Sequence, residues 1–137
     1  MINVTVQFSE NVFVTGTPRI QLETGTTDQY ATYVSGSGST TLNFEYTVAS
    51  GDTAIDLDYV ATNSLALNGG TIKDIATNNA TLTLVAPAAA NSLGANKAIV
   101  VDAILPTILS VSSSDTNGTY AAASTLIISV NFSEAVN

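Results

Sequence analysis

The sequence contains no cysteine and no histidine, and its 137 residues include only 3 basic residues against 11 acidic ones. Without these side chains, Ser-His and Cys-His nucleophile systems and zinc sites built on His or Cys are excluded. The formal net charge of −8 disfavours binding to nucleic acid or to an anionic membrane surface, because phosphate contacts require Lys and Arg. An acidic excess instead suits solubility, or divalent cations bound through carboxylates.

Long apolar runs and helical periodicity are also missing. No stretch of about 18 apolar residues predicts a membrane span, and no glycine loop of the phosphate-binding type is present. Ser, Thr and Asn are abundant while Lys, Arg and Glu are scarce, which favours strands and polar turns over helices. Met1 leads directly into a strand pattern, so we expect any targeting signal of the parent protein to lie outside this sequence.

The most informative feature is a repeated stretch. Residues 2–12 read INVTVQFSENV, and residues 126–136 read LIISVNFSEAV. Val6, Phe8, Glu10 and Val12 recur at an offset of 124 residues, the difference between positions 132 and 8. That distance is too long for a solenoid unit but suits a whole domain. The sequence therefore predicts one domain of a tandem array, followed by the first part of the next.

Alternating apolar and polar residues predict a series of short strands. The clearest are residues 2–8, 19–23, 30–34 and 41–48, and further strands are expected at residues 55–60, 65–67, 80–85 and 97–102. Turn residues separate them, as in Asn68-Gly69-Gly70. Two hairpins are expected, one that pairs residues 30–34 back on residues 19–23, and one whose loop is the Gly-rich stretch 35–39. Residues 87–94 contain Pro, Asn, Ser and Gly, which limits them to a loop with at most one helical turn.

These patterns predict an all-β protein, an Ig-like antiparallel β-sandwich of about 7–9 strands. We expect the sandwich to cover residues 1–102, a linker to cover residues 103–106, and the first strands of the next repeat to cover residues 107–137. Pro106 marks the boundary, because proline interrupts strand pairing. If each repeat begins after its linker, residues 1–102 lack the first strand of their own repeat. We therefore expect residues 107–137 to fold back or to be exchanged with a neighbouring molecule.

Several short motifs resemble those of bacterial Ig-like tandem repeats, including swimming-motility-associated and adhesin-type repeats. They are FSENV at 8–12, TPRIQL at 17–22, LDY at 57–59, GTIKD at 70–74, and Val101-Asp102 followed by Pro106. The chain departs from the family at Thr77, where a Gly is usual, and at residues 103–105, where an apolar linker replaces a Thr-Thr-Ala type. The resemblance implies an extracellular or cell-surface structural or adhesive module that contacts neighbouring repeats and is not an enzyme.

Calcium is the cofactor that the acidic residues suggest. Ca²⁺ takes 6–8 oxygen ligands, and the loops of a sandwich gather at its two ends. Candidate ligands therefore stand at strand ends and in acidic loops: Glu10, Asp58, Asp74 and Asp102. The same residues also fit a simpler interpretation, in which surface acids keep an apolar-rich β protein soluble.

Two other functions remain open from the sequence. A carbohydrate- or surface-binding module would use exposed aromatic rings, for which Tyr30, Tyr33, Tyr46 and Tyr59 are candidates, although strand alternation places most of them in the core or in cross-strand pairs. A carboxylate pair for glycoside hydrolysis could be drawn from the acids at 52, 56 and 58, but a solvated strand face explains them more simply.

Overall fold

The computed structural model describes all 137 residues, which divide into two compact units, Met1–Ile104 and Leu105–Asn137. The division falls inside the stretch 103–106 that the sequence marks as a linker. Strands hold 40% of the residues and helix only 3%, and the sheets are antiparallel. The predicted all-β, sandwich-like fold is therefore confirmed.

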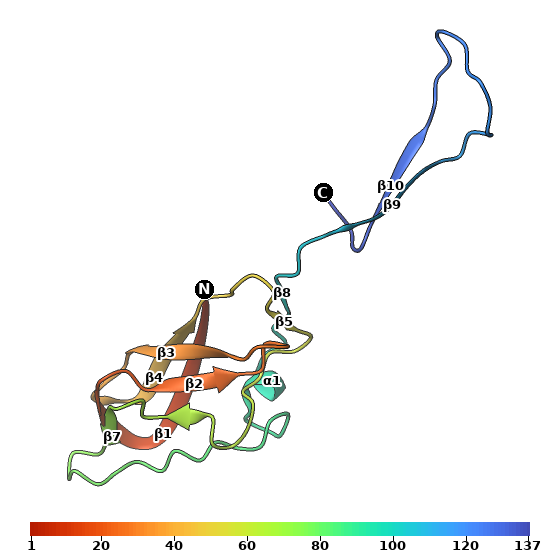
Figure 1. Ribbon diagram of the computed structural model, residues 1–137. Coiled ribbons are helices and arrows are strands. Elements are labelled where there is room, and N and C mark those ends of the chain that lie inside the picture. Colours follow the sequence, from red (N-terminus) through yellow and green to blue (C-terminus); the bar gives the residue numbers. More distant parts are fainter. The chain divides into compact units, whose positions relative to one another are not determined.

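The first unit is built on one curled, six-stranded sheet (Figure 1). Its strands lie in the order β6-β2-β3-β4-β1-β7. Their bounds are Ile2–Thr15 (β1), Arg19–Leu22 (β2), Gln29–Ser35 (β3), Ser39–Tyr46 (β4), Leu65–Ala66 (β6) and Thr71–Lys73 (β7). A small second sheet joins β5 (Thr53–Ala54) to β8 (Val101–Asp102). The first unit therefore has eight strands, within the predicted range of about 7–9.

Strand alternation sets the core. In β4, Leu42, Phe44 and Tyr46 are buried while the residues between them are only partly covered. Leu57, Tyr59 and other apolar residues from β1, β2, β3, β6 and β7 complete the cluster. Burying each large apolar side chain is worth about 1.5–3 kcal/mol, so this cluster is the main source of stability in the first unit.

Both predicted hairpins are present. β2 pairs antiparallel with β3, and β3 pairs antiparallel with β4. The second hairpin turns through residues 36–38, where Gly36 has a φ of 110°. A Cβ at Gly36 would lie only 2.1 Å from the carbonyl oxygen of Thr41, so no other residue fits this turn without a shift of the backbone.

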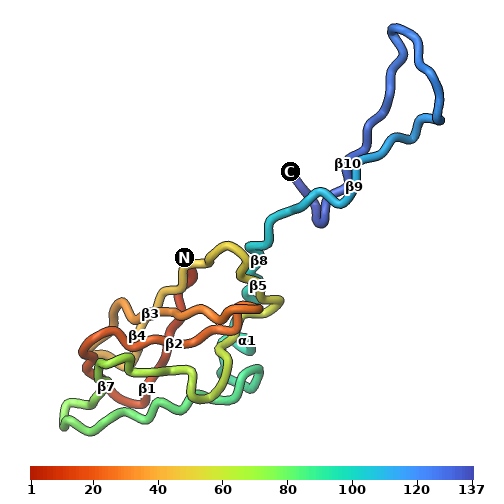
Figure 2. The backbone as a smooth tube through the Cα atoms, in the orientation of Figure 1, coloured from red at the N-terminus to blue at the C-terminus, as the bar shows by residue number.

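Two of the predicted strands, residues 55–60 and 80–85, are wrong as paired strands, and a third, residues 97–102, is paired only at its end, where Val101–Asp102 forms β8. Residues 80–85 and 97–100 have no strand partner, and residues 55–60 contribute only the single bridge between Tyr59 and Leu22. Figure 2 traces the path of the chain through these segments. Leu82, Leu84 and Ile99 still pack against the core. The alternation of apolar and polar residues indicates which face of a segment is buried. A paired strand also needs a neighbouring strand within hydrogen-bonding distance.

The only helix is the single turn α1 (Leu93–Asn96), at the end of the loop predicted to hold at most one helical turn. Its N-cap is the buried Ser92, whose Oγ accepts a hydrogen bond from the Ala95 N–H at 3.1 Å. No helix in the structure is long or apolar enough to cross a membrane.

The second unit is a two-stranded antiparallel hairpin of β9 (Ile108–Ser113) and β10 (Ile128–Phe132). β10 is the second copy of the repeated stretch, so both copies form strands. All residues of this unit are exposed except Asp115 and Glu134, which are half-buried. Two strands alone cannot bury an apolar face, so Ile108 and Val111 each expose 61% of their surface.

Candidate functional site

The four predicted calcium ligands stand on separate elements. Glu10 is exposed in β1, Asp58 is half-buried between β5 and β6, Asp74 follows β7, and Asp102 is exposed at the end of β8. No group of three or more acidic side chains lies close enough together to hold a metal ion. The structure thus does not bring the four residues into one cluster.

Asp58 holds two loop segments together. Its Oδ1 accepts a hydrogen bond from the Tyr59 N–H at 2.9 Å, and its Oδ2 accepts one from the Ala88 N–H at 3.0 Å. A Cβ at Gly94 would lie 3.1 Å from Asp58 Oδ2 and 3.5 Å from Asp56 Oδ2, so both carboxylates approach the first turn of α1. The Asp58 charge, together with burial as the larger cause, raises the pKa of Tyr59.

Asp74 closes the loop that follows β7. Its Oδ1 accepts a hydrogen bond from the Asn78 N–H at 2.8 Å, and its Oδ2 accepts one from the Asn78 side-chain amide at 2.7 Å. The side-chain bond from Asn78 is the largest cause that lowers the pKa of Asp74. Asp102 makes one local contact, in which its Oδ1 accepts from the Ile104 N–H at 3.2 Å. Both are turn-forming roles.

The most completely satisfied carboxylate in the chain is Asp52, which is only 3% exposed. Its Oδ2 accepts hydrogen bonds from the Tyr46 hydroxyl at 2.5 Å and the Ala49 N–H at 2.7 Å, and its Oδ1 accepts one from the Gln29 amide at 3.2 Å. Burial opposes ionisation of Asp52, yet these bonds outweigh it and lower its pKa. Burial, followed by the bond to Asp52, raises the pKa of Tyr46 above its usual value of 10.0.

This buried cluster fixes the end of the first unit. The Ala103 N–H donates to the Asp52 carbonyl at 2.9 Å, and the Gly51 N–H donates to the Ala103 carbonyl at 2.8 Å. The sequence favoured a core or cross-strand position for Tyr46 and a solvated strand face for Asp52. The second expectation is wrong, because Asp52 is buried, and the sequence gave no direct sign that the two side chains bond. The only indirect sign of this bond in the sequence is the spacing, since Asp52 follows the core residue Tyr46 by six positions across a turn.

The four candidate tyrosines differ in exposure, and two of them are buried. Tyr46 and Tyr59 are buried, and Tyr33 packs edge-on against Phe44 with ring centroids 5.9 Å apart. Tyr30 is 39% exposed, and the Arg19 guanidinium lies over its ring at 3.9 Å from the centroid. The face of one ring is therefore already occupied by a cation.

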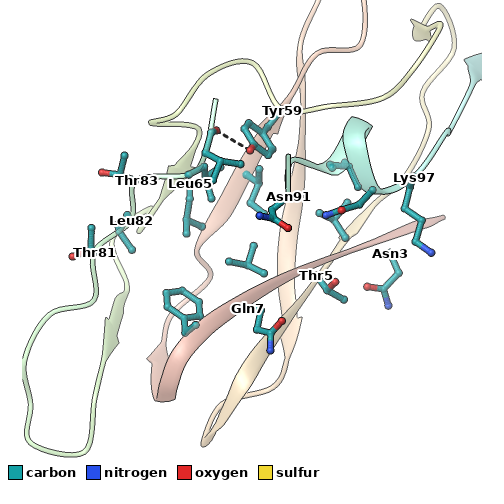
Figure 3. A pocket seen from close by; sticks show the side chains of 18 of the residues that line it. Asn3, Thr5, Gln7, Tyr59, Leu65, Thr81, Leu82, Thr83, Asn91 and Lys97 are labelled. Atoms are coloured by element: carbon teal, nitrogen blue, oxygen red, sulfur yellow. Dashed lines mark hydrogen bonds between the residues drawn. The ribbon is translucent and has the colours of Figure 1, made fainter. Parts of the chain in front are cut away.

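The first unit has a groove of about 960 Å³, which we call the β1 groove. One wall is residues 3–9 of β1, and the others are residues 81–85 and the segment around α1, from Asn91 to Ile99. Figure 3 shows Asn3, Thr5 and Gln7 on the β1 side and Thr81, Leu82 and Thr83 on the facing segment. Lys97 is the only charged residue in its lining.

The floor of the β1 groove is apolar. Six half-buried side chains that pack on the core also line the groove: Val6, Phe8, Leu82, Leu84, Leu93 and Ile99. Tyr59 also lines the groove, and its hydroxyl donates to the Val85 carbonyl at 2.8 Å. An apolar floor between two extended backbone segments suits an apolar strand better than a polar small molecule.

Comparison with protein-family models, with curated proteins and with solved structures gives no match to this chain. The resemblance to bacterial Ig-like repeats therefore rests on the sequence motifs alone.

Proposed function

We propose that this chain is a non-enzymatic structural repeat of a large bacterial extracellular or cell-surface protein, in which successive β units act as spacers. The observation that carries the proposal is the repeated stretch. Residues 4–8 and 128–132 share a sequence pattern at an offset of 124 residues, and both form strands, β1 and β10, in separate units. A chain that begins the same unit twice is what a tandem array produces.

The surface composition supports the same role. Exposed residues of β1 and β3 include Asn3, Thr5, Gln7 and Thr32, and the chain is strongly acidic. A polar surface with one sign of charge in excess keeps a repeated module soluble.

Stretching the intact chain from its two ends tests the spacer role. We expect one resisted unfolding event from the first unit, whose release adds about 3.3–3.6 Å of length per residue. Extension without any resisted event would contradict the proposal, because a spacer must remain folded under load.

Calcium stiffening remains a prediction of the sequence. If Glu10, Asp58, Asp74 and Asp102 bind calcium, the fold is more stable with excess calcium than with EDTA. At a free calcium concentration 100 times the dissociation constant, the gain is about 2.7 kcal/mol. For a chain of this size the melting temperature rises by roughly 8–15 °C. Superimposable melting curves would leave these acids with the turn-forming and solubilising roles described above.

A further inference from the structure

One edge of the central strand β1 has no partner over its first half. β4 pairs with Ile2–Gln7 along one edge, and β7 pairs only with Phe13–Thr15. No other strand pairs with residues 2–9, so the opposite edge presents free N–H and C=O groups. This edge is one wall of the β1 groove, and a free edge of this kind is a template for an added strand.

In the second unit, the second copy of the repeated stretch has a strand partner, which is β9. In the hairpin, β9 runs antiparallel to β10, which is the second copy of β1. The register pairs Ile128 with Ser113, Ser129 with Ser112, Val130 with Val111, Asn131 with Ser110, and Phe132 with Ile108. Just beyond the strands, the Ser133 N–H donates to the Thr107 carbonyl, and the Ser133 Oγ accepts from the Thr107 N–H.

The same register can be placed on β1 by moving back 124 residues. The partners of a β9 strand then become Val4, Thr5, Val6, Gln7 and Phe8, with Ser9 in the place of Ser133. All six residues line the β1 groove. Because β4 already occupies the other edge of β1, the groove edge is the only place that such a strand can take.

The side chains of β9 match the two faces of this edge. Val111 and Ile108 would lie beside Val6 and Phe8, which are half-buried on the inner face. Ser112 would lie beside Thr5, which is exposed on the outer face. The segment from Ile108 to Ser113 carries no charge, so no charge is buried when it enters the apolar groove.

We propose that the β1 groove accepts residues 107–113 of a second copy of the chain as an added antiparallel β-strand. The gain is burial of apolar surface on both partners, since Ile108 and Val111 are each 61% exposed in the hairpin. The inference deepens the proposed function, because it rests on the same internal repeat and names the partner of that repeat.

Disulfide trapping between full-length chains tests the register, since the native chain has no cysteine. Two variants, Thr5→Cys and Ser112→Cys, are mixed and oxidised, and the linked pair is identified by mass spectrometry. Both positions are exposed, so neither variant disturbs the core. We expect several-fold more mixed dimer than from Ser50→Cys with Ser112→Cys, because Ser50 lies in an exposed turn outside the groove. Equal yields from the two mixtures would overturn the proposal.

Two further variants make the test specific to the groove. Added to the Ser112→Cys chain, Val111→Asp should abolish the excess of mixed dimer, because it places a carboxylate in the apolar groove. Ser110→Asp, which faces outward in the same register, should leave most of the excess of mixed dimer. A synthetic peptide of residues 105–114 should compete for the groove and lower the yield of mixed dimer. Loss of the excess with both aspartate variants alike would count against insertion into the groove.

A double variant, Thr5→Cys with Ser112→Cys in one chain, decides whose strand is bound. Linked dimers that increase with protein concentration support a second copy, whereas closed monomers at every concentration would overturn it. The outcome is independent of the stretching experiment. A chain that resists force but gives no specific cross-link remains a spacer without strand exchange, and a chain that cross-links without resisting force accepts a strand but is no spacer.

Discussion

At the residue scale, the first unit depends on one buried carboxylate. Asp52 accepts three hydrogen bonds, from the Tyr46 hydroxyl, the Ala49 N–H and the Gln29 amide. In Asp52→Asn an amide nitrogen replaces one acceptor oxygen, so a buried donor is left without a partner. We expect a loss of about 1–3 kcal/mol in the free energy of unfolding, measured by urea denaturation. Asp56→Asn, at an exposed acid, is the matched control and should change stability by less than about 0.5 kcal/mol.

The lowered pKa of Asp52 also predicts how stability depends on pH. Because the folded pKa lies below the usual value of 3.8, the ionised form stabilises the fold at pH values above that value. This contribution is lost as the pH falls through the folded pKa. The difference in stability between the wild type and Asp52→Asn should therefore shrink in acid. A difference that stayed constant from pH 6 to pH 2 would show that ionisation of Asp52 does not contribute.

At the element scale, the buried side chains of β4 contribute most to the stability of the sheet. Phe44 is fully buried and its ring contacts Tyr33, so Phe44→Ala should cost about 3–5 kcal/mol. Thr32→Ala, at an exposed position that pairs with Glu45 across the same two strands, should cost less than about 0.5 kcal/mol. Equal losses in the two variants, measured by thermal or urea denaturation, would contradict the assignment of the buried face.

The sequence predicts elements well wherever the chain supplies its own partner. Alternation and turn residues located β1 to β4, β9 and β10 and both hairpins, because sequential strands pair with each other. Residues 80–85 and 97–100 show the same alternation but have no ladder, since pairing depends on a neighbour that local sequence does not specify. Leu82 and Ile99 nevertheless pack against the core, and both also line the β1 groove.

The site was less predictable than the fold, for a related reason. Asp58, Asp74 and Asp102 each satisfy nearby backbone groups, so a strand-end or loop acid can equally well close a turn or face a shared ion. The sequence does not distinguish these roles. The bond between Tyr46 and Asp52 was missed because it depends on how far the turn folds back over the sheet.

At the scale of the whole molecule, the two units differ in how much they bury. Nearly every residue from 105 to 137 is exposed, while the first unit has a continuous apolar core. Brief digestion with a protease of broad specificity should therefore cut the second unit first and leave a resistant fragment close to residues 1–104. Mass spectrometry identifies the fragment, and first cuts inside β1 to β4 would contradict this order of stability.

If β1 accepts a strand from another molecule, its free edge is open in isolated chains and covered when chains associate. Hydrogen exchange of the intact chain at low and at high protein concentration measures this directly. We predict that the amides of residues 3–9 that point away from β4 exchange rapidly in dilute solution and become protected as concentration rises. The amides of β3 and β4 should stay protected throughout, and those of residues 107–113 should gain protection together with the free edge of β1. Exchange at residues 3–9 and 107–113 that is the same at every concentration would contradict the account.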